Sequence, residues 1–60
     1  MIKVESMYAT TFEELVKNTD GLINVLRAEL KGFRIISVSH SNPNETHPKY
    51  STLIVYEYNP

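Results

Sequence analysis

Three side chains that could coordinate a metal ion lie between residues 39 and 52, in the segment SHSNPNETHPKYST. They are His40, Glu45 and His47, and they include both histidines of the chain. Imidazole and carboxylate groups are common ligands of zinc and other divalent ions. Metal-binding pairs, however, usually stand one residue apart on a strand or at helical spacing, and these three do not. We therefore expect neither a metal nor another cofactor at this segment.

The same segment has the composition of a long connection between two strands. Pro43 fixes φ, and Asn42 and Asn44 can hydrogen-bond to nearby backbone, so NPN is a strong turn signal. A connection of about nine residues is longer than most hairpin loops, and long loops often carry function. Its polar groups suit a nucleotide or another polar ligand held between two protomers. The predicted ligand-binding residues are Asn42, Asn44, His47, Lys49, Tyr50 and Arg34.

The charges of this 60-residue chain are balanced, with six basic and seven acidic side chains that form no runs. That balance argues against a broad surface for duplex nucleic acid. Arg34 lies near Arg27 and Lys31 in the sequence and could meet a phosphate, although solvated basic groups at a helix end are the favoured interpretation of these three residues. We find no activated nucleophile and no Gly-rich phosphate loop, and we expect no enzyme.

The first half of the chain predicts one strand followed by one helix. Residues 1 to 8 alternate with the period of a half-buried strand. Residues 11 to 31 carry apolar side chains at steps of three and four, and Thr11 with Glu14 fits a capping box, with Thr10 and Glu13 as an alternative frame. Residues 18 to 21, NTDG, are weak helix formers, but the apolar side chains before and after them lie on the same face of one helix. One helix should therefore run through them and end near Gly32, a typical C-cap residue.

The second half predicts two strands, at residues 33 to 41 and 49 to 58, because both segments are rich in β-branched and aromatic residues. The turn-rich segment between them makes them neighbours in an antiparallel hairpin. We therefore predict a single α+β domain over residues 1 to 60, with β-α-β-β order and one long helix packed on one face of a three-stranded sheet. Strand-like alternation follows Met1 at once, which predicts no secretory signal, no membrane span and a cytoplasmic location.

The predicted sheet has more apolar side chains than one helix can cover. If the helix covers Ile2, Val4, Ile36, Val38, Leu53 and Val55, the opposite face presents a set that we predict to form an interface. This set comprises Ile35, Ile54, Tyr56 and Tyr58. If the parity of the last strand is reversed, the tyrosines are buried and Leu53 and Val55 are exposed instead. In either case apolar side chains remain uncovered on the sheet, which predicts a homo-oligomer. A stacking platform for single-stranded nucleic acid is the less favoured alternative, because basic residues are sparse.

Four segments resemble a family of small sporulation-associated proteins of the Cse type, which occur in spore-forming Gram-positive bacteria and their phages. They are IKV at the start, LINVL at residues 22 to 26, IISVS at 35 to 39 and YSTLIVYE at 50 to 57. The resemblance spans most of the chain, and its motifs are largely structural. It offers no catalytic residues to transfer, and the segment NPNETHP departs from the simpler connection of the family.

The expected function is a non-enzymatic oligomeric binding protein. Taken with the resemblance, this suggests a phage accessory or anti-defence protein that sequesters a nucleotide signal or blocks a host protein. The alternative is a sporulation-associated structural or adaptor protein.

Overall fold

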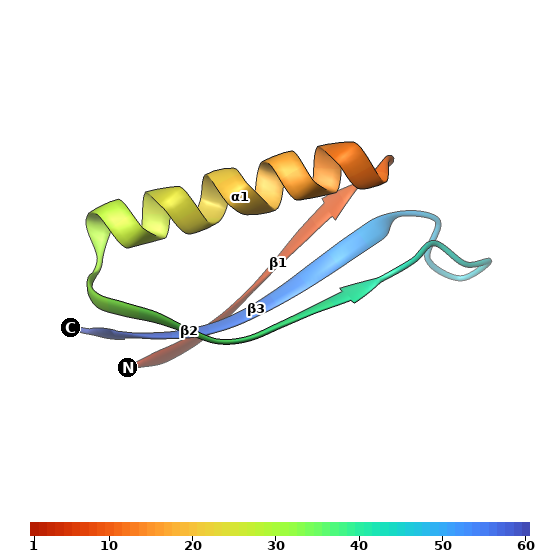
Figure 1. Cartoon of the computed structure of the whole chain (residues 1–60). Helices are drawn as coiled ribbons and strands as arrows, with labels where there is room; N and C mark the ends of the chain where they lie inside the picture. Colours follow the sequence, from red (N-terminus) through yellow and green to blue (C-terminus); the bar gives the residue numbers. More distant parts are fainter.

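The computed structural model describes all 60 residues and has the predicted order of elements. These are β1 (Ile2–Ala9), α1 (Phe12–Glu29), β2 (Lys31–Ser41) and β3 (Tyr50–Asn59). The three strands form one sheet, and α1 runs along one side of it (Figure 1). The chain is therefore an α+β fold, as predicted.

The last strand of the chain is the central strand of the sheet. The strand order is β1-β3-β2, and β3 is antiparallel to both neighbours. The hairpin of β2 and β3 was predicted, whereas the insertion of β3 between β1 and β2 was not. Both termini lie at one end of the sheet, and the connection from residue 42 to 49 lies at the other (Figure 1). β2 and β1 are therefore the two edge strands.

Helix α1 is continuous through Asn18–Gly21, as its apolar phase predicted. It begins after Thr11, whose hydroxyl accepts a hydrogen bond from the backbone N–H of Glu14 at 3.2 Å. The Glu14 carboxylate accepts a second bond, from the Thr10 hydroxyl at 3.2 Å. The Thr11 frame is therefore the one used, and Glu13 and Glu14 complement the positive end of the helix dipole.

The predicted helix end at Gly32 is wrong. The helix ends at Glu29, and Leu30 is already extended, with φ of -106° and ψ of 131°. Gly32 does have a positive φ of 66°, but it lies inside β2, where the register with β3 shifts. A Cβ atom at Gly32 would come within 2.8 Å of the Asn59 side-chain carbonyl carbon, so both the backbone and the close contact require glycine.

The face of the sheet under α1 is set by the parity of β3. Ile54 and Tyr56 have exposed fractions of 0% and 1%, and Thr52 is buried beside them. The expectation that Ile54 and Tyr56 face outward is therefore wrong. Tyr58 packs against the same core, and Ile35 stands opposite Tyr56 in the register.

We call the face of the sheet away from α1 the outer face. The β3 register places Leu53 and Val55 there, and Val4 stands opposite Val55 on β1. Ile2 lies on the same face of β1 as Val4, while Val38 pairs with Ile54 on the helix side. Of the set expected under the helix, the register therefore confirms Val38 alone, and the reversed parity of the last strand holds. A register shift between Ile35 and Ser37 rotates β2 relative to β3, which alternation alone does not reveal.

The core is small and consists of Leu26 from α1 with Ile54 and Tyr56 from β3. Partly buried neighbours surround it: Leu22, Ile23, Leu30, Phe33 and Tyr58. The Tyr56 hydroxyl donates a hydrogen bond to the Glu5 carboxylate at 3.2 Å. Burial, and secondarily the charge and hydrogen bond of Glu5, raise the pKa of Tyr56 above the ordinary tyrosine value of about 10.

Replacing Gly21 by alanine should stabilise the protein. Gly21 is helical, and a Cβ atom there would meet no atom within 4 Å. Alanine loses less backbone entropy on folding, so Gly21→Ala should raise the free energy of unfolding by about 0.5 to 1 kcal/mol in urea denaturation. Gly32→Ala is the matched control and should lower it by about 1 kcal/mol or more. Equal effects of the two substitutions would contradict this account of the glycines.

The raised pKa of Tyr56 should make the protein less stable in strong alkali. Below pH about 10 the phenol is neutral in both the folded and the unfolded state; above it, the unfolded chain releases the proton first. The free energy of unfolding should therefore fall above pH 10, by up to about 1.4 kcal/mol per pH unit from this group. Urea unfolding between pH 8 and 11 should show a flatter curve for Tyr56→Phe. Parallel curves would refute the assignment.

Candidate ligand-binding site

A pocket with a volume of about 370 Å³, lined mainly by polar residues, lies at the hairpin end of the outer face. Its floor is one row across the sheet, in which Ser51 of β3 stands opposite Tyr8 of β1 and Ser41 of β2. The connection from residue 42 to 49 forms its rim. We call this cavity the hairpin pocket. Its lining residues are Tyr8, Ser41, Asn42, Asn44, His47, Pro48, Lys49 and Ser51.

Asn44 holds the rim in shape. Its side-chain oxygen accepts hydrogen bonds from the backbone N–H groups of Thr46, at 2.9 Å, and His47, at 2.8 Å. The backbone N–H of Asn44 in turn donates to the carbonyl of His47 at 2.8 Å. Asparagine is suited to this local bonding because its short amide reaches backbone groups two and three residues ahead. The loop therefore places the His47 ring at a defined point over the end of the sheet.

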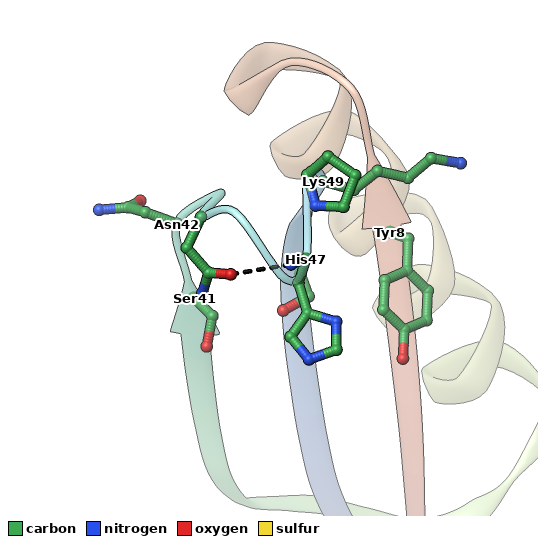
Figure 2. A pocket seen from close by; sticks show the side chains of 8 residues that line it. Tyr8, Ser41, Asn42, His47 and Lys49 are labelled. Carbon is green, nitrogen blue, oxygen red and sulfur yellow. Dashed lines mark hydrogen bonds between the residues drawn. The ribbon is translucent and has the colours of Figure 1, made fainter.

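Two rings and one cation dominate the chemistry of the hairpin pocket. The rings of His47 and Tyr8 lie beside each other on the same side of the ribbon, whereas Asn42 and Lys49 extend away from them in different directions (Figure 2). Tyr8 has an exposed fraction of 62%, so its ring is open to a ligand. Lys49 is the single cation among the lining residues, and no carboxylate is among them. This combination suits a planar, anionic ligand.

Four of the six predicted ligand-binding residues line this pocket, and two do not. Asn42, Asn44, His47 and Lys49 line it.

Tyr50 and Arg34 lie elsewhere. The Tyr50 ring packs edge-on against Phe12 of α1 at 5.9 Å, so it belongs to the helix side. Arg34 forms an ion pair with Glu57 near the opposite end of the sheet. The strand register corrects both predictions. Tyr50 is excluded because neighbours in sequence alternate between faces, and Arg34 because it lies opposite Glu57, far along β2 from Ser41.

Tyr8 is the pocket residue that the sequence did not reveal. It is more than thirty positions from the loop in sequence, and alternation grouped it with the side chains expected under the helix. It reaches the pocket because β3 inserts beside β1 and brings Ser51 opposite Tyr8. No local pattern signals this neighbourhood.

The two histidines do not meet. His40 lies on the helix side, where its ring contacts Phe12 edge-on at 5.5 Å, and His47 lines the hairpin pocket on the outer face. No group of three or more potential metal ligands comes together anywhere in the chain.

A second cavity of about 370 Å³ lies on the helix side, between α1 and β2. We call it the α1–β2 groove. It exists because α1 lies closer to β1 and β3 than to β2, which leaves Val38 half exposed beside Phe12 and Val16. Its lining is mainly apolar, with Asp20 and His40 among the polar members.

No family model matches the sequence, and no curated protein or solved structure is significantly similar to it. The helix α1 is not apolar enough over its length to cross a membrane.

Removing the Asn44 amide should loosen the rim of the pocket without unfolding the domain. In Asn44→Ala the backbone N–H groups of Thr46 and His47 lose their acceptor. Their hydrogen exchange should become about fivefold faster or more, while the free energy of unfolding changes by less than about 1 kcal/mol. Asn42→Ala is the matched control, because the Asn42 side chain points away from the His47 ring (Figure 2). Unchanged exchange in Asn44→Ala would contradict this account.

Proposed function

We propose that the protein is a non-enzymatic binding protein of the cytoplasm that holds a nucleotide in the hairpin pocket. The observation that carries this proposal is that two distant parts of the chain bring an exposed tyrosine and a histidine ring together at one cavity, with a lysine on its rim. A volume of about 370 Å³ is within the range of small-molecule sites.

Each group has a part in such binding. The Tyr8 ring, with His47 beside it, offers a face on which a base can stack. Lys49 is long and flexible, and its ammonium group can swing to a phosphate placed at the rim. The hydroxyl groups of Ser41 and Ser51 provide donors and acceptors for sugar or base edges. Because no carboxylate lines the cavity, nothing there repels an anion.

The function that fits such a site is sequestration. A ligand bound stoichiometrically is withdrawn from its other partners, and no bond needs to break. Such withdrawal of a nucleotide signal is the action expected of a phage accessory or anti-defence protein.

The second candidate is an adaptor that acts through a protein surface, either by blocking a host protein or as a sporulation-associated structural component. The apolar outer face favours it, since Val4, Leu53 and Val55 have no cover from α1. The two candidates differ in what they bind, and a ligand titration separates them.

Isothermal titration with AMP, ADP, ATP and cyclic mono- and dinucleotides tests the first proposal. At least one should bind with a micromolar dissociation constant. Tyr8→Ala and Lys49→Ala should each weaken that binding by about tenfold or more, because stacking and a charge-assisted hydrogen bond are lost.

Arg34→Ala is the matched control for Lys49→Ala. It also removes one cation exposed at the edge of the sheet, but near the opposite end, and should leave affinity within about twofold. Absence of binding by every nucleotide would refute the proposed function. Equal weakening by Arg34→Ala and Lys49→Ala would show that the chain attracts nucleotides by net charge and not in the hairpin pocket.

A further inference from the structure

The centre of the outer face consists of two rows of side chains across the three strands. The register places Val4 opposite Val55 and Val55 opposite Ser37, and it places Ser6 opposite Leu53 and Leu53 opposite Ser39. The apolar members line up along β1 and β3, where Val4 is 58% and Leu53 43% exposed. β2 contributes only serines to these rows. An antiparallel sheet face that meets water is normally polar along all its strands, and this one is not.

The outer face is also nearly free of charge. The two central rows and the row of Tyr8 contain no charged residue, although the chain has thirteen basic and acidic side chains. Arg34 and Glu57 are at one end of this face, and they neutralise each other in an ion pair. Depletion of charge is the compositional mark of the buried centre of a protein interface. Two such faces can meet without leaving an unpaired charge between their central rows.

The single chain exposes more surface than a compact protein of its size. Its accessible surface is 4458 Å², whereas a folded monomer of 6.9 kDa exposes about 4,000 Å². Its radius of gyration is 12.4 Å, against about 10 Å for a compact 60-residue domain. Only six of its residues are buried. Small domains that lack disulfides commonly gain stability from self-association.

We propose that the outer face is the interface of a homodimer, in which the sheets of two copies stack face to face with their helices outside. We assign the partner as a second copy because every copy of the chain has the same shortage of buried surface. A permanent partner supplies the missing burial, and a second copy presents the same uncharged, apolar rows. This surface replaces the interface of Ile35, Ile54, Tyr56 and Tyr58 expected from the sequence.

The available area is sufficient for such a dimer. β3 has ten residues, so the sheet is about 33 Å long and, with three strands, about 14 Å wide. This footprint is roughly 450 Å² per copy and includes the row of Tyr8, so the floor of the hairpin pocket lies at the margin of the interface. Side-chain relief raises the area buried by two copies to roughly 1,200 Å², the lower limit of a stable specific interface. Stacked sheets lie about 10 Å apart, which the small serines of β2 allow.

The α1–β2 groove is the competing surface, and its charges disfavour it. Asp20 is among its lining residues, and burying an unpaired carboxylate would cost more than the neighbouring apolar contacts return. The outer face lacks such a group in its central rows. Val38, which lines the groove at an exposed fraction of 50%, therefore provides a control position matched to Leu53.

Light scattering after size exclusion, supported by native mass spectrometry, tests the proposal on the full chain. The wild type should have twice the 6.9 kDa chain mass at micromolar concentration. Leu53→Glu and Val4→Glu should each raise the dimer dissociation constant at least about 100-fold, because two carboxylates would be buried per dimer. Both positions are exposed in the single chain, so the variants should retain the helical circular dichroism of the wild type.

Val38→Glu should remain dimeric, because it places the same charge on the helix side. A wild type of single mass even at submillimolar concentration would overturn the proposal. It would also be overturned if the dimer survived both outer-face substitutions, or if Val38→Glu dissociated it and they did not. These masses are measured without nucleotide, so failure of the dimer and failure of the hairpin pocket remain distinguishable.

Discussion

The packing of Leu26 against Ile54 and Tyr56 is the contact on which the rest of the structure depends. These two β3 residues are the largest fully buried side chains, and β3 is the strand that holds both neighbours in the sheet. Once Ile54 faces α1, the pleat of the sheet places Leu53 and Val55 on the outer face. The buried Tyr56 hydroxyl is not left without a partner, because it donates a hydrogen bond to the Glu5 carboxylate at the margin of the core.

A central strand with apolar residues on both faces has a structural consequence. One face of β3 is covered by α1, and no second helix of the structure covers the other. The protein therefore has a thin core together with an uncovered apolar face, and these two features have the same cause. Stacking of a second sheet would turn the outer rows into a core of their own, with the helices as its outer layers.

The hairpin pocket depends on the same insertion of β3. Residues 42 to 49 would form an isolated loop if β3 paired with β2 alone. With β1 on the other side of β3, the loop closes over Tyr8, and the pocket acquires its exposed aromatic ring. Asn44 fixes the shape of the loop by local bonds, so a long connection does not have to be mobile. The site combines local turn chemistry with a contact between distant parts of the chain.

The sequence by itself determined the element order, the continuous helix with its Thr11 cap, the hairpin, and four of the residues around the pocket. These features rest on local interactions: helical periodicity, capping, and turn preferences of asparagine and proline. Only the tertiary structure decided which face of β3 lies under α1, where β3 sits in the sheet, and that Tyr8 joins the pocket while Tyr50 and Arg34 do not. Both faces of β3 carry apolar side chains, so alternation could not choose between them. The choice was made by the bulged register of β2 and by how well Ile54 and Tyr56 pack against Leu26, which are contacts between residues far apart in the chain.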